Sequence, residues 1–183
     1  MKRSSLQRIF LYLFLLGVCT QASLAADITL FTGVQNPGEL TINNVVRDTK
    51  LGGVFGARFS GGQVIGFEQT LAYSPNFLES SRQAFTAQSN LHVGIPVGHV
   101  VPYGTAGVGL IATFGDSVFD LGTKFAFNYG GGVKLLPAGP VGIGVDVRGY
   151  SVPSTEFRVF TTQDQTVNFL EVSVGVVFTF SSK

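Results

Sequence analysis

The last segment of the chain alternates between apolar and polar positions. From Leu170 to Phe180 every second residue is apolar, whereas most of the residues between them, such as Glu171 and Ser173, are polar or small. A period of two places these two kinds of side chain on opposite faces of a β-strand. A soluble sheet would bury the apolar face in a core, whereas a membrane-spanning barrel would turn it toward lipid and keep the polar face inside.

Seven earlier segments have the same strand character, and turn-rich breaks separate them. The eight predicted strands cover residues 27–34, 51–60, 64–73, 85–95, 101–114, 125–135, 141–150 and 168–180. Most are at least as long as the ~9–11 residues that a tilted strand needs to cross a bilayer. A typical soluble strand has only about 5–6 residues. The lengths therefore favour strands that span a membrane.

The breaks between the predicted strands alternate in length. Short breaks rich in Gly or Pro follow the second, fourth and sixth strands. The long polar breaks follow the first, third, fifth and seventh strands and cover residues 35–50, 74–84, 115–124 and 151–166. Membrane barrels have short turns at one rim and longer loops at the other. The alternation therefore predicts a closed, up-and-down antiparallel barrel with both chain ends at the short-turn rim.

The first 25 residues have the features of an export signal. Basic residues at positions 2, 3 and 8 precede an apolar run over 9–18, and Ser23 and Ala25 form a small-x-small cleavage site. The apolar run is shorter than the ~20 residues of a spanning helix. We therefore predict a signal peptide over 1–25 and a β-barrel domain over 26–183. Lipidation at Cys19, in a loose lipobox, is the alternative to cleavage after Ala25.

Composition narrows the possible chemistry. Cys19 is the single cysteine, so a chain cleaved after Ala25 has no thiol for a disulfide or a thiolate metal site. Cleavage leaves 9 of the 12 basic residues against 11 acidic ones, and no basic stripe indicates nucleic acid. The Gly-rich stretches 104–109 and 130–132 lack the following helix that phosphate binding needs. We therefore expect no cofactor, no metal ion and no nucleic-acid partner.

The predicted polar faces carry a sparse set of ionisable residues that we expect to face the lumen: Arg58, Glu68, His92, Lys134, Asp146, Arg148 and Glu171. Simple counts across the hairpin loops put Glu68 opposite His92 and Asp146 near Glu171, with Arg148 one step away. An eight-stranded barrel is just wide enough to be filled by side chains, and an isolated buried charge is costly. We therefore predict an ionic network that fills the lumen, with Arg148 as the partner of Glu171; a path for protons or solutes is the alternative.

Three glycine-rich strand segments, residues 101–109, 125–134 and 141–150, carry a family resemblance. Their alternating faces and glycines resemble the outer-membrane protein β-barrel family, which includes the OmpA membrane domain, OmpX and the opacity-type proteins. The resemblance covers 26–180 and implies an all-β, eight-stranded antiparallel transmembrane barrel in a Gram-negative outer membrane. Such proteins end in an aromatic residue read by the barrel-assembly machinery. Phe178 and Phe180 fit that signal, although residues 181–183 follow them.

Neither histidine lies in a recognisable catalytic motif. Some small outer-membrane barrels hydrolyse or transfer lipid A acyl chains with a His–Ser pair, and the deacylase type has a serine two residues after its histidine. Here Gly94 stands two residues after His92, and Val101 stands two residues after His99. The sequence therefore predicts no enzymatic activity, and His99 is interpreted as a turn residue at the short-turn rim.

These observations predict a small outer-membrane barrel with a structural or surface-interaction role, such as adhesion. We expect a monomer in contact with outer-membrane lipid and lipopolysaccharide, with an extracellular ligand bound through loops 35–50 and 151–166. Three alternatives stay open: a narrow porin-like channel for small solutes, a lipid-modifying enzyme, and a soluble periplasmic β-protein.

Overall fold

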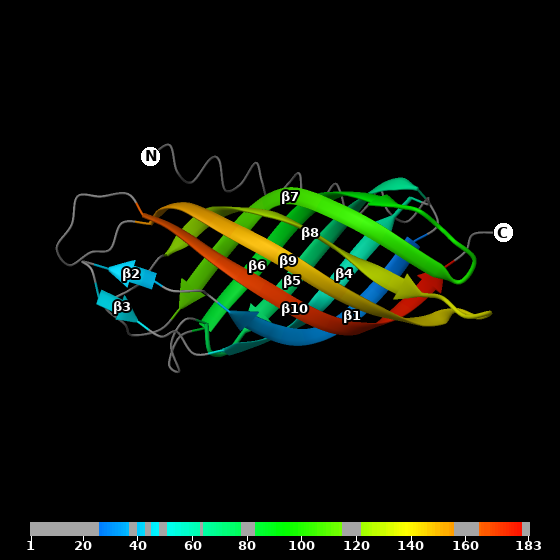
Figure 1. The fold of residues 1–183 in the computed structure, drawn as a ribbon, viewed down its shortest axis with the longest axis horizontal. Helices are drawn as coiled ribbons and strands as arrows, with labels where there is room; N and C mark the ends of the chain where they lie inside the picture. The colour runs from blue at the N-terminus through cyan, green and yellow to red at the C-terminus, as the bar shows by residue number, and fades with distance from the viewer. Residues whose placement is uncertain are drawn as a thin grey trace.

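Eight long strands close into an antiparallel barrel. The computed structural model describes residues 26–36, 40–42, 45–47, 51–62, 64–77, 83–114, 122–155 and 165–180. The barrel strands are β1 (Ala26–Asn36), β4 (Gly52–Gly61), β5 (Ile65–Ser74), β6 (Gln83–Gly94), β7 (Val100–Phe114), β8 (Thr123–Leu135), β9 (Val141–Thr155) and β10 (Gln165–Phe180). Each pairs with the next along the chain, and β1 pairs with both β4 and β10, which closes the barrel (Figure 1). The predicted eight-stranded antiparallel barrel is confirmed.

The long-loop rim contains more regular structure than the sequence predicted. Strand β9 extends to Thr155 and β10 begins at Gln165, so both ends of the predicted loop 151–166 belong to strands. The predicted loop 35–50 contains a two-stranded hairpin of β2 (Leu40–Ile42) and β3 (Val45–Arg47), which lies beyond the rim at the left of Figure 1. The remaining residues of the long loops lie mostly outside the described part of the chain.

The alternation of the sequence becomes an apolar exterior and a buried interior. On β10, Leu170 and Val174 are 47% and 50% exposed, whereas Glu171 and Ser173 between them are 1% and 3% exposed. The other barrel strands also expose large apolar side chains on their outer faces, as Val145 and Val147 do on β9. A soluble sandwich would bury such a face. Among the described residues, no helix is long and apolar enough to cross a membrane.

The interior is apolar at the long-loop end. Eight buried residues form one cluster there, which we call the apolar cap: Phe77, Ala84, Ile111, Ala126, Tyr150, Val152, Val167 and Phe169. The rings of Tyr150 and Phe169 stack at 4.6 Å between centroids, and the Phe77 ring meets Phe169 edge-on at 5.3 Å. Phe77 follows β5 rather than lying within a strand, so the cap combines strand residues with a residue from the rim.

Inward-facing glycines leave room for large polar neighbours in the narrow lumen. A Cβ on Gly107 would lie only 2.1 Å from Oδ1 of Asn90, and a Cβ on Gly130 would lie 3.1 Å from Cγ of Arg148. Both glycines therefore allow a long side chain of an adjacent strand to cross the interior.

Candidate functional site

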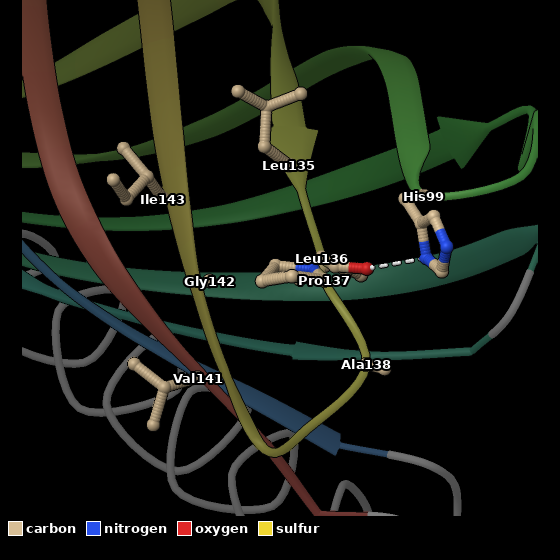
Figure 2. A pocket seen from close by; sticks show the side chains of 8 residues that line it. All are labelled: His99, Leu135, Leu136, Pro137, Ala138, Val141, Gly142 and Ile143. Atoms are coloured by element: carbon tan, nitrogen blue, oxygen red, sulfur yellow. Dashed lines mark hydrogen bonds between the residues drawn. The ribbon is translucent and has the colours of Figure 1, made fainter.

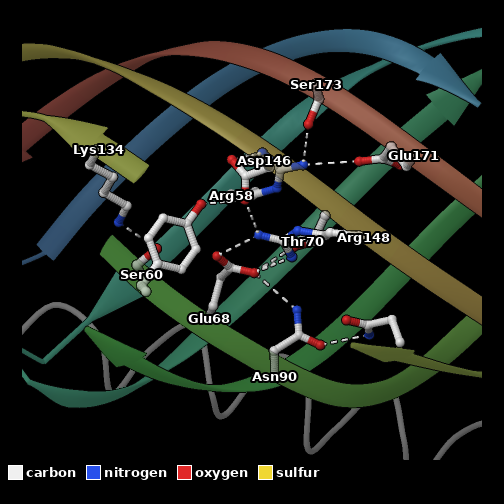
Figure 3. Close-up of polar contacts among 12 residues, drawn as sticks. Arg58, Ser60, Glu68, Thr70, Asn90, Lys134, Asp146, Arg148, Glu171 and Ser173 are labelled. Carbon is white, nitrogen blue, oxygen red and sulfur yellow. Dashed lines mark hydrogen bonds and ion pairs between the residues drawn. The ribbon is translucent and has the colours of Figure 1, made fainter. Parts of the chain in front are cut away.

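Two arginines and three carboxylates occupy the middle of the lumen, and we call them the central ionic network: Arg58, Glu68, Asp146, Arg148 and Glu171 (Figure 3). The Arg58 guanidinium joins two strands, because its Nη1 lies 3.0 Å from Oδ2 of Asp146 and its Nη2 lies 2.9 Å from Oε1 of Glu171. Its Nη2 also donates to the Ser173 hydroxyl at 2.8 Å. The guanidinium carbon lies 3.7 Å from the centroid of the Phe31 ring, which is within the range of a cation–π contact.

Arg148 completes the network from the opposite side of Asp146. Its two terminal nitrogens bind both oxygens of Glu68, at 2.6 and 3.0 Å, in a bidentate pair. Its Nη2 also lies 2.9 Å from Oδ1 of Asp146, which accepts a hydrogen bond from the Tyr103 hydroxyl as well. Asp146 therefore bridges the two arginines, and the charges form one connected chain from Glu171 to Glu68.

Uncharged side chains extend the network toward the long-loop end. Gln35 donates to Oε2 of Glu171 at 3.0 Å and accepts from the Ser74 hydroxyl at 2.9 Å. On the other side, Asn90 donates to Oε1 of Glu68 at 3.0 Å. Asn128 in turn donates to Asn90 at 2.7 Å and to Gln88 at 2.8 Å. These bonds satisfy carboxylate lone pairs that the arginines leave free, as a buried ionic cluster requires.

A separate ion pair lies nearer the short-turn rim. Nζ of Lys134 lies 3.0 Å from Oδ2 of Asp27 and 3.5 Å from the Ser60 hydroxyl. The ammonium also lies 5.3 Å from the centroid of the Tyr103 ring. The Lys134 side chain is 5% exposed and that of Asp27 is 20% exposed, so solvent reaches the acidic partner.

The structure places all seven residues of the predicted lumen set in the buried interior. Six of them make ion pairs, five within the central ionic network and Lys134 with Asp27. His92 has no hydrogen-bond partner among the described residues, and its ring lies against Tyr103 at 4.8 Å between centroids. The sequence analysis did not include Asp27 and Tyr103 in the lumen set. Both occupy inward positions of their strands, so the alternation of faces along β1 and β7 would have placed them in the lumen.

The predicted pairing of β5 with β6 was wrong by two residues. Glu68 lies opposite Asn90, and His92 lies opposite Gly66. The predicted strand ends at the long loop, Tyr73 and Phe85, do lie opposite each other, so the strand bounds were adequate and the count from them to Glu68 was two residues too long. A shift of two residues keeps every side chain on its predicted face, whereas a shift of one would reverse the faces. The residues therefore face the lumen as expected, but Glu68 binds Arg148 instead of lying beside His92.

The predicted partner of Glu171 was also wrong. Glu171 lies opposite Arg148 in the β9–β10 ladder, and Asp146 lies opposite Ser173. Nevertheless the Glu171 carboxylate binds Arg58 of β4, because the Arg148 guanidinium is engaged by Glu68 and Asp146. The residue that lies opposite in the β-ladder is thus not necessarily the ion-pair partner, because long side chains reach across the lumen.

An apolar groove lies at the short-turn rim, between the end of β8 and the start of β9 (Figure 2). Its volume is about 520 Å³, and its walls include Leu135, Leu136, Val141 and Ile143. His99 stands at its edge, where Nδ1 lies 3.1 Å from the carbonyl oxygen of Leu136. The interpretation of His99 as a turn residue agrees with its exposed position between β6 and β7. The groove itself was not predicted.

Phe178 and Phe180 lie in the last residues of β10, opposite Ile28 and Ala26 of β1. Phe180 is 56% exposed on the outer face. Their reading as an assembly signal stays a prediction.

Within the described ranges, no group of three His, Cys, Asp or Glu side chains is arranged to hold a metal ion.

The fold matches solved structures over most of the chain, although the sequence identities are low. No protein-family model matches the chain, and no curated protein matches it in sequence. The crystal structure of Neisserial surface protein A matches with a TM-score of 0.66 at 13% identity, over 85% of this chain and 97% of that one. The chain has the fold of outer-membrane β-barrels.

Two proteins of Pseudomonas aeruginosa support the same assignment of fold. The outer-membrane protein OprG matches with a TM-score of 0.56 at 12% identity, over 87% of this chain and 97% of that one. The N-terminal β-barrel domain of OprF matches with a TM-score of 0.53 at 11% identity, over 85% and 97%. At these identities the likeness is one of architecture, so residue roles must be argued from this chain alone.

Proposed function

We propose that this protein is a monomeric, non-conducting outer-membrane barrel of a Gram-negative bacterium, with a structural or surface-interaction role. Export by residues 1–25 and recognition of Phe180 by the barrel-assembly machinery belong to the same proposal. The apolar outer face of every barrel strand supports a location in lipid, because such a surface is unfavourable in water. Any extracellular ligand would bind through loops 35–50 and 151–166, where the rim carries the β2–β3 hairpin.

The closed lumen carries the functional part of this proposal. The central ionic network joins β4, β5, β9 and β10 across the barrel through contacts of 2.6 to 3.0 Å. The apolar cap lies beyond it at the long-loop end. A hydrated ion would have to break buried ion pairs and then shed its water in the cap, and both steps are costly. The interior therefore favours a scaffold over a pore.

Electrical recording tests the closed lumen. The purified barrel, inserted in a planar lipid bilayer, should show no conductance above that of bare lipid. A variant in which Phe169→Ala opens the cap but leaves the ionic network intact should also be silent, because the network alone blocks the path. Steady conductance of the wild-type barrel, lost on neutralising Arg148 or Glu171, would instead support the narrow porin-like channel.

Cell fractionation tests the location. The protein should require detergent for extraction from the outer-membrane fraction, and its migration on a gel should change on boiling, as folded barrels do. Recovery in the soluble periplasmic fraction would overturn the membrane proposal. Labelled lipopolysaccharide incubated with the barrel should keep its acyl chains, and their release or transfer would establish the lipid-modifying alternative.

A further inference from the structure

Three inward-facing side chains on one row of paired residues carry buried polar atoms without a hydrogen-bond partner in the described part of the chain. These atoms are both ring nitrogens of His92, the hydroxyl oxygen of Thr105 and Nε of Arg148, none of which has a hydrogen-bond partner within the described ranges. His92 lies opposite Thr105, Thr105 opposite Gly130, and Gly130 opposite Arg148. The four residues thus form one row across β6, β7, β8 and β9.

Because Gly130 has no side chain, the Arg148 side chain can pack closely against strand β8. Cγ of Arg148 lies 3.1 Å from the position that a Cβ on Gly130 would take, so the Arg148 stem packs against this glycine, which lies opposite Thr105. His92 is 4% exposed, Thr105 6% and Arg148 fully buried. Buried polar atoms of this kind are normally bonded to protein or to ordered water.

The hydrogen-bond donors and acceptors of the row determine which kind of ligand can bind there. Nε of Arg148 can only donate a hydrogen bond, a neutral histidine ring donates from one nitrogen and accepts at the other, and the threonine hydroxyl does both. An anion without a proton could not donate to the histidine acceptor, and any anion would be repelled by Glu68 and Asp146, which already bind Arg148. A cation could not accept from Arg148. Water, which donates two hydrogen bonds and accepts two, satisfies every atom of the row.

The interior around the row is asymmetric along the barrel axis. Toward the short-turn rim the next inward positions are Tyr103 and Asp146, which are hydrogen-bonded to each other, and beyond them lies the Lys134–Asp27 pair, in which the Asp27 side chain is 20% exposed. Toward the long-loop rim the row is followed by the amide groups of Asn90, Asn128 and Gln88, of which Oδ1 of Asn128 and Nε2 of Gln88 also lack a hydrogen-bond partner within the described ranges, and then by the apolar cap. Solvent therefore has a polar approach from one end only.

We propose that His92, Thr105 and Arg148 bind ordered water at the inner end of a solvent pocket that opens toward the short-turn rim. The site does not depend on any surface role of the protein, because it is defined by the lumen alone. It gives the interior on the short-turn side of the apolar cap a hydrated character and leaves the cap itself dry.

Water-to-methyl cross-relaxation in NMR tests both parts of the proposal on the full-length chain, expressed with its own leader and purified from membranes in detergent micelles. Strand β7 supplies matched probes, because Val101, Thr105 and Ile111 all point inward at increasing distance from the short-turn rim. The methyl groups of Val101 and Thr105 should show transfer from water, and that of Ile111 in the apolar cap should show none. Absence of transfer at Thr105 would overturn the water site. Equal transfer at Ile111 would overturn the one-ended pocket.

A substitution provides the second test. Thr105→Val keeps the shape of the side chain and removes its hydroxyl, so a bound water loses one partner. We expect weaker transfer from water to the His92 ring and a lower urea midpoint of unfolding. Thr70→Val, which removes a hydroxyl bonded directly to Glu68 at 3.2 Å, is the matched control and should lower the midpoint without changing the His92 signal. A midpoint that rises or stays constant in Thr105→Val would show a dry hydroxyl and overturn the proposal.

Discussion

The middle of the lumen and its long-loop end share strands β9 and β10 but hold opposite kinds of side chain. On β9, Asp146 and Arg148 enter the central ionic network, whereas Tyr150 and Val152, at the next inward positions, enter the apolar cap. Strand β10 repeats the change in the other direction, with Phe169 in the cap and Glu171 in the network. The network depends on specific partners at hydrogen-bond distance, whereas the cap depends on area buried and shape. Substituting one residue should therefore lower the free energy of unfolding for a different reason in each region.

The largest effect is expected from Arg148→Met in the network. Without the guanidinium, Glu68 loses its bidentate partner and Asp146 loses one of its two cations. Removing one member of a buried ion pair typically costs about 3–5 kcal/mol. We expect that loss in the free energy of unfolding, measured in urea by the gel shift between folded and unfolded barrel.

A double variant distinguishes the effect of the broken Glu68–Arg148 ion pair from the effect of the altered packing at position 148. Adding Glu68→Gln to Arg148→Met removes the orphaned carboxylate and should restore part of the stability. A loss below ~1 kcal/mol for the single variant would mean that the network contributes no more than a surface ion pair. No recovery in the double variant would mean that Glu68 is not the group that depends on Arg148.

A smaller effect is expected from Phe169→Ala in the cap. The ring packs between Tyr150 and Phe77, so its removal leaves a cavity among apolar neighbours. Truncation of a buried phenylalanine costs about 3–5 kcal/mol, and we expect the lower end of that range because Phe77, which lies outside the strands, can move into the cavity. Phe169→Leu fills most of the space and should cost about 1 kcal/mol. Equal losses in the two variants, measured by the same unfolding assay, would show that shape does not matter in the cap.

The smallest effect is expected from Lys134→Met, outside both regions. Because the Asp27 side chain is partly exposed to solvent, water can replace the lost ammonium. We expect a loss of about 1 kcal/mol, as for weakly buried ion pairs, and a smaller loss at high salt. A loss as large as that of Arg148→Met would place Lys134 among the essential partners of the network.

The faces of the strands could be read directly from the sequence. A strand points successive side chains to opposite sides, so the parity of a position decides whether it meets lipid or lumen. For this reason the predicted lumen residues Arg58, Glu68 and Asp146 all lie inside, and the alternating loop lengths correctly predicted eight strands in a closed barrel. These properties are local, and each strand carries them independently of its neighbours.

The partners within the lumen were decided by the tertiary structure. Register depends on where each strand ends at its loop, and ion pairs depend on which side chains cross a closed barrel. Glu171 therefore binds Arg58, 113 residues away in sequence, although Arg148 lies opposite it on the adjacent strand. Likewise Phe77, which follows β5, joins the apolar cap, and His92 packs against Tyr103 with no hydrogen-bond partner in the described part of the chain. The alternation of apolar and polar residues along β10 thus determines that Glu171 faces inward, and only closure of the barrel determines which residue it binds.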